Sequence, residues 1–456
     1  MSSNRDCLVS KDKKYSIHPY TNLSVHEQKG PLVITEGDGI YVFDDQGKRY
    51  IEGLSGLWCT GLGYSETRLM DAAQRQFQSV PFGHSFSHRA SAPTIELAQK
   101  LLATAPEKLT RAYFVNSGSE AVDCAIKFVW YYNNALGRKD KKKIIARYGA
   151  YHGVTVAAGS LTGLPFVHNG FDLPIDRVLH TGEPHFYRCA LPGEDEETFA
   201  TRLADELEQL IISQGPDTIA AFIAEPVMGA GGVLIPPATY FEKVQKVLKR
   251  YDVLLIADEV ICGFGRTGAM WGSQTFGLQP DLITCAKQMS SAYLPIGAVL
   301  ATEEIYQAML EQSNKLGVFG QGHTYGGHPV CAAVALETLK IYEDDKILEH
   351  VAKVSPHFLA RLKQLGEHPL VGDARGVGLI GAIELVADKA NRTPFPAAKK
   401  AAVLVNDLTT KNGLILRPLP NDCVGLCPPL IITIAELDDI FERLTSALDA
   451  AQALLS

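Results

Sequence analysis

LLIADEVICGFGRTGAMWG (residues 254–272) and PDLITCAKQMSS (residues 280–291) contain two short apolar runs, each followed by charged side chains. The first run leads into Asp258 and Glu259, and the second leads into Lys287. A lysine ammonium is strongly hydrated, so placing it at the end of a buried strand costs free energy unless a task or a partner compensates. Lys287 is therefore a candidate functional residue. A strand-end lysine that reaches solvent is the simpler alternative.

Schiff-base chemistry with pyridoxal phosphate (PLP) needs both of these residue types. The cofactor requires a lysine amine for its imine and an acidic group that keeps its pyridinium nitrogen protonated, because the protonated ring withdraws electrons well. Lys287 and Asp258 supply this pair. Taken singly, each residue is more simply explained as a strand terminus or a helix cap.

The order of apolar runs predicts an α/β fold with a large, mostly parallel sheet. From about residue 110 to 300, short β-branched runs alternate with longer amphipathic stretches, as in successive βα units. Beyond Pro329, a helical stretch, a strand over 379–385 and a final helix with a Thr433–Glu436 capping box predict a smaller α+β unit. Residues 39–43 and 49–51 flank a turn that suits a hairpin. The strands of the large sheet are expected at 112–115, 144–147, 219–224, 253–257, 282–285 and 296–301, with helices at 199–214 and 240–250.

Composition excludes several classes of protein. The 456 residues carry a formal net charge of -8, and no Lys/Arg stripe suits a nucleic acid. The amino terminus is polar, and no segment approaches the roughly 20 apolar residues of a membrane span, which predicts a cytoplasmic protein. Nine scattered cysteines predict neither a disulfide framework nor a metal site. Lys141, Lys142 and Lys143 are interpreted as a solvated turn before a strand.

Three further groups of polar residues follow predicted strands. Asn116-Ser117-Gly118-Ser119-Glu120 opens a helix, so its hydroxyls and free backbone N–H groups suit a phosphate, although a plain capping box explains the same letters. Tyr151 lies between two glycines and could stack on a cofactor ring. Glu225 ends the 219–224 strand at the sheet edge where α/β proteins bind ligands, unless it is merely solvated.

Two stretches match the dinucleotide fingerprint GxGxxG by letter alone. Residues 263–268 do not follow a strand directly and do not open a helix, and residues 376–381 continue as a strand. The fingerprint needs the strand–turn–helix context, so neither stretch predicts nucleotide binding. An NAD-dependent oxidoreductase is the alternative from another class.

Residues 254–272 and 280–291, with SGSEA (117–121) and FGQGHTYGGHPV (319–330), resemble the class III, fold-type I PLP aminotransferases along nearly the whole chain. Within that family, ICGFGRTG (261–268) and GLWCTGLGY (56–64) look most like the pyruvate-dependent ω-transaminases. The resemblance implies a fold-type I PLP-transferase with a large domain at 61–328. A small domain would combine 1–60 with 329–456.

The resemblance also implies roles for individual residues. Lys287 would form the Schiff base and Asp258 would pair with the ring nitrogen. Arg417 corresponds in position to an arginine that binds substrate carboxylates, although an exposed strand-end arginine is the alternative. The implied cofactor site further contains Ser117, Gly118, Ser119, Tyr151, Glu225, Val260 and Thr324, the last from the neighbouring subunit of a homodimer. The implied substrate pockets contain Leu57, Trp58, Phe86, Ser87, Tyr151, Ala230 and Ile261.

The implied reaction moves an amino group from a primary amine or ω-amino acid to pyruvate in two half-reactions, with Lys287 as the base that shuttles the proton. A homodimer, with a tetramer as an alternative, would carry the shared sites. Two other class III reactions remain open: transamination of 4-aminobutyrate with 2-oxoglutarate, and decarboxylation-dependent transamination.

Overall fold

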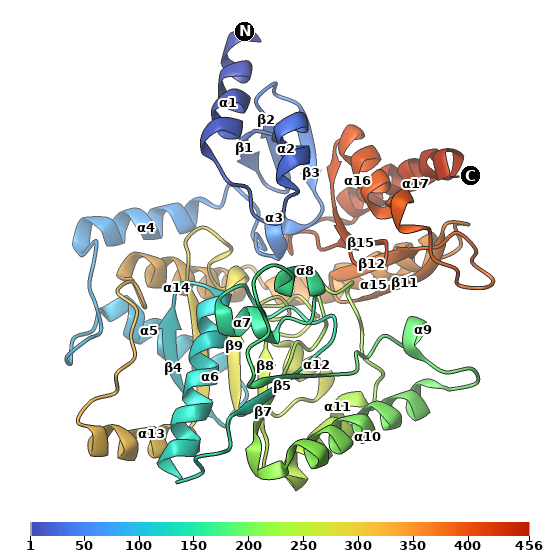
Figure 1. Ribbon diagram of the computed structural model, residues 1–456. Coiled ribbons are helices and arrows are strands. Elements are labelled where there is room, and N and C mark those ends of the chain that lie inside the picture. Colours follow the sequence, from blue (N-terminus) through green and yellow to red (C-terminus); the bar gives the residue numbers. More distant parts are fainter. Residues whose placement is uncertain (1, 456) are drawn as a thin grey trace.

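A seven-stranded sheet forms the centre of the computed structural model, which describes residues 2–455 (Figure 1). β10 is antiparallel to β4 and β9, and all other neighbours in the sheet are parallel. The mostly parallel sheet predicted from the sequence is therefore confirmed. In spatial order, the strands are β4 (Leu109–Val115), β10 (Gly297–Thr302), β9 (Leu282–Cys285), β8 (Leu254–Asp258), β7 (Ile219–Ala224), β5 (Lys143–Arg147) and β6 (Val178–Thr181).

Helices cover both faces of this sheet, and successive strand residues point to opposite helix layers. In β7, Phe222 belongs to one apolar cluster with α10 and α11, while Ile223 belongs to another with α6. Because both faces are buried, β7 is apolar throughout, which explains why its run of six apolar residues lacks the alternation of a half-exposed strand. The helices around the sheet are α5 (Ala92–Thr104), α6 (Gly118–Ala135), α7 (Val156–Leu161), α8 (Pro165–His168), α9 (Phe186–Cys189), α10 (Glu196–Gln214), α11 (Tyr240–Arg250), α12 (Gly272–Phe276) and α13 (Glu303–Leu316).

Two smaller sheets join the ends of the chain. In the first, β13 (Leu414–Ile415) pairs in parallel with β3 (Arg49–Glu52), so segments more than 350 positions apart lie side by side. That sheet continues through the predicted hairpin of β2 (Tyr41–Asp44) and β3 to β1 (Ile34–Asp38). The second sheet is antiparallel and contains β11 (Val371–Val377), β12 (Ile380–Leu385), β15 (Cys423–Leu426) and β14 (Arg417–Leu419). The domain boundaries at residues 60 and 328 stay predictions.

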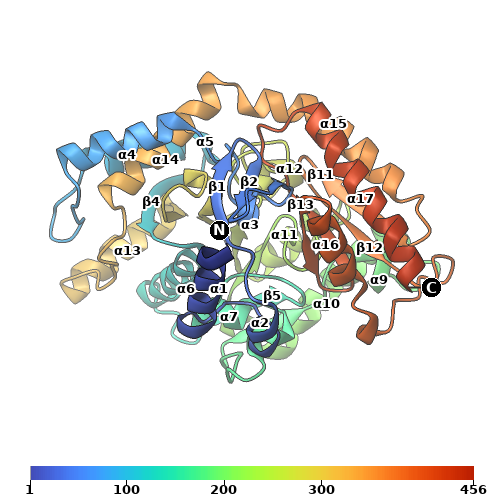
Figure 2. The ribbon, with the colours of Figure 1, turned by 90° about the horizontal axis from the view of Figure 1, so that it is seen from above.

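The remaining helices lie at the two ends of the chain. Figures 1 and 2 show α1 and α2 above the central sheet, with α15 and α17 to one side. The predicted capping box of the last helix is present, since Thr433 N donates to Glu436 Oε2 at 2.8 Å and Glu436 N donates to Thr433 Oγ1 at 3.3 Å. These helices are α1 (Ser2–Tyr15), α2 (Leu23–Lys29), α3 (Ser55–Trp58), α4 (Thr67–Ser79), α14 (Pro329–Asp344), α15 (Ile347–Leu365), α16 (Ala401–Lys411) and α17 (Ile434–Leu455). Three 3₁₀ turns are η1 (Pro216–Thr218), η2 (Lys287–Ser290) and η3 (Ala397–Lys399).

Two sequence expectations need correction. The edge strand β6 was not predicted, because it has only four residues and two of them, His180 and Thr181, are polar. Lys141 is not part of a solvated turn: its side chain is 6% exposed, and its Nζ donates to the carbonyl of Tyr251 at 3.2 Å. Within residues 2–455, no helix has the length and apolar character needed to cross a membrane.

Candidate active site

The carboxyl ends of the parallel strands bring the predicted site residues to one edge of the central sheet. Asp258 ends β8, Glu225 follows β7, and Lys287 follows β9 by two residues. The Ser117 turn follows β4 in the same way. Open α/β sheets bind ligands at this edge, because the loops that leave neighbouring strands meet there.

Asp258 is a buried carboxylate held by a histidine. His152 Nδ1 lies 2.7 Å from Asp258 Oδ2, and Val260 N donates to Asp258 Oδ1 at 3.1 Å. Both side chains are shielded from solvent, with Asp258 only 3% exposed. His152 was not predicted from the sequence. The feature that could have identified it was its position next to Tyr151, in a loop that leaves the same sheet edge as Asp258.

The other ring nitrogen of His152, Nε2, is a buried polar atom without a hydrogen-bond partner among residues 2–455. Buried polar atoms normally find a partner, so such an atom points to a missing ligand or water. This orphan nitrogen lies on the ring that orients Asp258.

Lys287 adopts an unusual backbone conformation among the charged groups of the site. Its φ is 50°, in the left-handed region that side-chain-bearing residues rarely occupy, and such a residue stores of order 1–3 kcal/mol of strain. Burial lowers the pKa of Lys287, although Cys59, Asp258 and Glu225 oppose the shift; Arg417 adds to it. A lysine of lowered pKa has a larger neutral fraction at neutral pH, as a nucleophile or proton carrier requires.

Glu225 fixes the loop that carries Tyr151. Its Oε1 accepts from Tyr151 N at 3.0 Å, and its Oε2 accepts from Gly229 N at 3.0 Å. Burial raises the pKa of Glu225, despite an opposing effect of His152. Glu225 is therefore no solvated strand terminus, because both carboxylate oxygens organise the loops around the site.

The Ser117 turn has the features of an anion site and of a helix cap together. Ser117 is the N-cap of α6, and its Oγ accepts from Glu120 N at 3.2 Å. The Glu120 carboxylate reaches back to Asn116 N at 2.7 Å, one residue earlier than in a standard capping box. A Cβ on Gly118 would lie 2.9 Å from Val260 Cγ1, so only glycine fits between this turn and Val260.

Trp58 and Ile261 share one apolar cluster next to Lys287. Trp58 is almost fully buried in this cluster, whereas the adjacent Leu57 is 52% exposed. A Cβ on Gly229 would lie 2.7 Å from Ile261 Cδ1, which brings the half-buried Ala230 segment against the same cluster. Of the predicted pocket, Trp58, Ile261 and Ala230 therefore lie together.

Arg417 begins β14 as a half-buried guanidinium that faces two phenols. Burial lowers the pKa of Arg417, while Tyr151 and Tyr20 raise it. Within the described part of the chain, no carboxylate lies within 4.0 Å of this guanidinium. Tyr20 was not predicted: it comes from the α1–α2 connection, and its ring centroid lies 6.3 Å from that of Tyr151.

Three predicted residues lie elsewhere in a single chain. Phe86, Ser87 and Thr324 are all exposed, in the connections between α4 and α5 and between α13 and α14. The Phe86 ring lies against Gly322 and does not join the cluster of Trp58 and Ile261. One chain alone thus does not complete the predicted pocket.

The donor set suits PLP. It offers an amine of lowered pKa, a buried carboxylate with a histidine partner, and hydroxyl and backbone N–H groups at the start of α6. Gly118 leaves the close approach that a phosphate needs, with Val260 beside it. The buried and unpartnered His152 Nε2 is consistent with a further polar partner at this site.

Comparison with known proteins agrees with this chemistry. The family model described as aminotransferase class-III matches residues 23–448. "Gamma aminobutyrate transaminase 1, mitochondrial" from Solanum lycopersicum is 52% identical over 419 residues, which cover 92% of this chain and 81% of that protein. "Vanillin aminotransferase" from Capsicum annuum is 50% identical over 419 residues, 92% of this chain and 91% of that one.

Solved structures show the same architecture. The ω-transaminase from Pseudomonas jessenii in complex with PMP matches with a TM-score of 0.97 and 52% identity, covering 98% of this chain and 99% of that one. A structure described as "Transaminase with L-ala" matches with a TM-score of 0.92 and 55% identity, covering 93% of this chain and 100% of that chain.

Proposed function

The chain belongs to the class III aminotransferase family, and we propose that it transfers an amino group from a primary amine or an ω-amino acid to pyruvate, which leaves as alanine. The protein is a PLP-dependent aminotransferase with an α/β, fold-type I architecture. The choice of donor and of acceptor is the proposed part. It rests on the charges that surround Lys287.

The residues of the site have different proposed roles. Bound PLP supplies the electron-withdrawing ring on which amino-group transfer depends. Lys287 Nζ would hold the cofactor and carry the proton removed from the donor, and its lowered pKa favours the neutral amine that this task needs. Asp258, oriented by His152, would stabilise the positive charge of the ring nitrogen. Ser117, Gly118 and Ser119 would hold the phosphate, and Tyr151 and Val260 would contact the ring.

The single observation that carries the substrate proposal is the free guanidinium of Arg417. Three arginines act electrostatically on the groups of this site: Arg417 on Lys287, Arg147 on Glu225 and Arg266 on Cys59. Arg147 and Arg266 are fully buried and donate to backbone carbonyls, Arg147 to Glu225 at 2.6 Å and Arg266 to Leu379 and Pro428 at 2.8 and 2.6 Å. Arg417 is the half-buried member of the three and is available for a ligand carboxylate. One available arginine matches a keto acid with one carboxylate, such as pyruvate. A dicarboxylate such as 2-oxoglutarate calls for a second cation.

The donor end of the pocket has apolar walls. In this proposal Trp58 and Ile261, which share one apolar cluster, form the wall against which an alkyl or aryl group packs. An ω-amino acid places its amine at Lys287 and its carboxylate at Arg417. A plain amine uses the apolar wall alone. Several relatives are called gamma-aminobutyrate transaminases, and 4-aminobutyrate is an ω-amino acid of this kind.

A homodimer completes the site in this proposal. The exposed Phe86, Ser87 and Thr324 would meet the Lys287 site of a second copy, where Thr324 reaches the phosphate and Phe86 closes the pocket. The absence of nucleic-acid and membrane partners stays a prediction. The cytoplasmic location stays a prediction.

A substrate panel tests the proposal. Initial rates are measured with 4-aminobutyrate, a polyamine and 1-phenylethylamine as donors, each with pyruvate and with 2-oxoglutarate. We expect pyruvate to give the higher kcat/KM with every accepted donor. A preference for 2-oxoglutarate would overturn the acceptor assignment and leave the aminotransferase activity intact.

Arg417→Leu sharpens the same test. In single-turnover donor half-reactions, this variant should lose about 10²-fold in kcat/KM with 4-aminobutyrate, because a buried carboxylate loses its charged partner. The same reaction with 1-phenylethylamine should change less than about threefold. Arg361→Leu, which removes a surface arginine paired with Asp438 at 3.5 Å, is the control and should change neither. Equal losses with both donors would remove Arg417 from carboxylate binding.

A further inference from the structure

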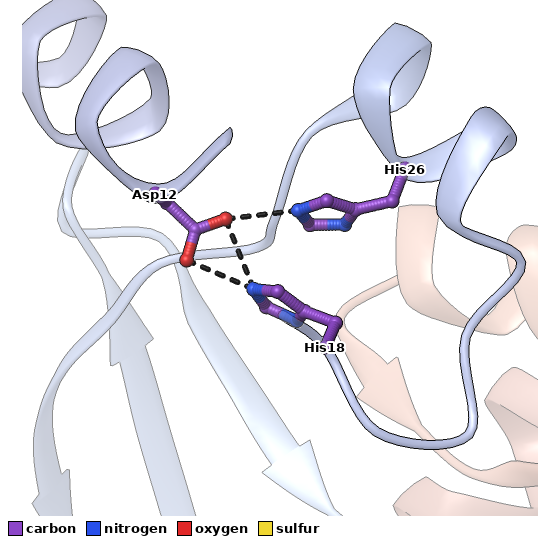
Figure 3. A group of neighbouring side chains, drawn as sticks. All are labelled: Asp12, His18 and His26. Carbon is purple, nitrogen blue, oxygen red and sulfur yellow. Dashed lines mark hydrogen bonds and ion pairs between the residues drawn. The ribbon is translucent and has the colours of Figure 1, made fainter. Parts of the chain in front are cut away.

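Three side chains near the amino terminus converge on one point outside the transamination site (Figure 3). Asp12 lies on α1, His26 lies on α2, and His18 lies in the connection between them. His18 Nε2 lies 2.8 and 3.0 Å from the two oxygens of Asp12, and His26 Nε2 lies 2.9 Å from Asp12 Oδ2. The two imidazole rings are stacked with their centroids 3.9 Å apart.

This convergence differs from the other exposed or half-buried histidine–aspartate contacts of the chain. His357 with Asp438, and His368 with Asp449, each join a single imidazole to a single carboxylate. Among residues 2–455, Asp12, His18 and His26 form the group of three potential metal ligands whose donor atoms all lie within 4.8 Å of one another. Both histidines present the same nitrogen, Nε2, to the shared carboxylate.

The cluster is also partly shielded. His26 is 8% exposed, and Asp12 and His18 are half-buried. One carboxylate and two imidazoles supply the ligand types that zinc and similar cations prefer.

We propose that Asp12, His18 and His26 bind a divalent transition-metal cation of the zinc class, with water as the fourth ligand. Bonds of about 2.0–2.1 Å in tetrahedral geometry place ligand atoms roughly 3.3 Å apart. The two histidine–aspartate separations of 2.8 and 2.9 Å need to widen by a few tenths of an ångström to admit the ion, and all three ligand atoms lie within 4.8 Å of one another. Each imidazole keeps one proton, which moves to Nδ1 when Nε2 coordinates.

Such an ion would tie down a segment that covers the aminotransferase site. His18 precedes Tyr20 by two residues, and the Tyr20 ring lies 6.3 Å from the ring of Tyr151 and 6.0 Å from that of Phe166 on α8. The three ligands come from α1, from the connection and from α2. Coordination therefore fixes both ends of the loop that carries Tyr20. This inference is independent of the acceptor and donor proposed above.

Zinc binding to the full-length, PLP-loaded protein without a histidine tag provides the test. Equilibrium dialysis against micromolar ZnCl₂, read by elemental analysis, should show one more zinc ion per chain in the wild type than in Asp12→Asn. The asparagine amide keeps the size of the side chain and one acceptor oxygen but is a poor zinc ligand. We expect its affinity for this ion to fall at least about tenfold. His18→Gln should behave likewise, and His357→Ala, which removes one histidine of a simple pair, should match the wild type.

Trypsin supplies a second readout. Lys14 is exposed at the end of α1, next to the cluster. Zinc should slow cleavage after Lys14 in the wild type and in His357→Ala, but not in Asp12→Asn. Equal zinc content in the wild type and Asp12→Asn would overturn the site. Equal protection by zinc in both would also contradict it, because the protection would then come from zinc bound elsewhere.

Discussion

The carboxyl edge of the central sheet and the two exposed loops around Phe86 and Thr324 differ in how far their side chains find partners within one chain. At the edge, Asp258 has His152 and a backbone N–H, and Glu225 uses both oxygens within the same chain. In the loops, Phe86 and Thr324 are exposed, with Phe86 42% accessible. The half of the site proposed to hold the cofactor is preformed in one chain, whereas the half proposed to close it awaits a second copy.

Asp258→Asn is expected to give the largest loss at the preformed edge. A neutral amide cannot stabilise a charged ring nitrogen, so kcat should fall by about 10³-fold while the fold is kept. Steady-state kinetics and circular dichroism measure the two effects. Asp281→Asn changes a half-buried aspartate that accepts from Leu255 N at 2.8 Å, and it should leave kcat within about threefold of the wild type. Near wild-type turnover in Asp258→Asn would remove this residue from its role.

Thr324→Arg addresses the exposed half. A bulky cation on this exposed loop should leave the monomer fold unchanged yet lower activity by about 10²-fold, because it obstructs the site of the second copy. Mixing it with inactive Lys287→Ala and exchanging subunits should restore about a quarter of wild-type activity, since half of the random dimers carry one intact site. No recovery on mixing would show that each chain contains its whole site.

His152→Phe tests the second layer of the preformed edge. The variant leaves Asp258 buried without its imidazole partner, and activity should fall about 10- to 100-fold, with a shift in the visible spectrum of the cofactor. His180→Phe is a suitable comparison because His180 is a half-buried histidine that bonds the carbonyl of Leu161 instead. An unchanged spectrum in His152→Phe would confine this residue to packing.

Replacement of Glu384 is expected to have a smaller effect than the changes above, and to affect stability instead of activity. Burial raises its pKa, but His185, Arg375 and Arg188 outweigh burial and lower it from 4.5 to about 2. The carboxylate therefore stabilises the folded chain above the unfolded pKa, and this contribution, about 3 kcal/mol, is lost as the pH falls from about 4.5 toward 2. Urea unfolding at pH 7 and pH 3 should show a smaller difference in Glu384→Gln than in the wild type. Glu349→Gln, at an exposed glutamate, should retain the full difference.

The sequence predicted those parts of the fold and site that local patterns determine. The strands 219–224 and 282–285 have their predicted bounds, because fully apolar runs bounded by polar residues leave little freedom. Asp258 and Lys287 could be identified as candidate site residues from the sequence because each follows such an apolar run.

Long-range contacts escaped prediction for a physical reason. The contacts of His152 with Asp258, of Tyr20 with Tyr151, and of Asp12 with His26 depend on how distant segments meet in space. Neither hydrophobic periodicity nor secondary-structure propensity predicts these contacts between distant segments. The exposure of Phe86 and Thr324 likewise depends on how the whole chain folds, which cannot be read from the sequence alone.

Covalent trapping of the cofactor tests whether Lys287 is the residue that holds it. The purified holoenzyme is reduced with borohydride, digested and analysed by peptide mass spectrometry. We expect the phosphopyridoxyl group on Lys287 and on no other lysine, and its disappearance together with turnover in Lys287→Ala. Label on a different lysine, or normal turnover in Lys287→Ala, would contradict the assignment.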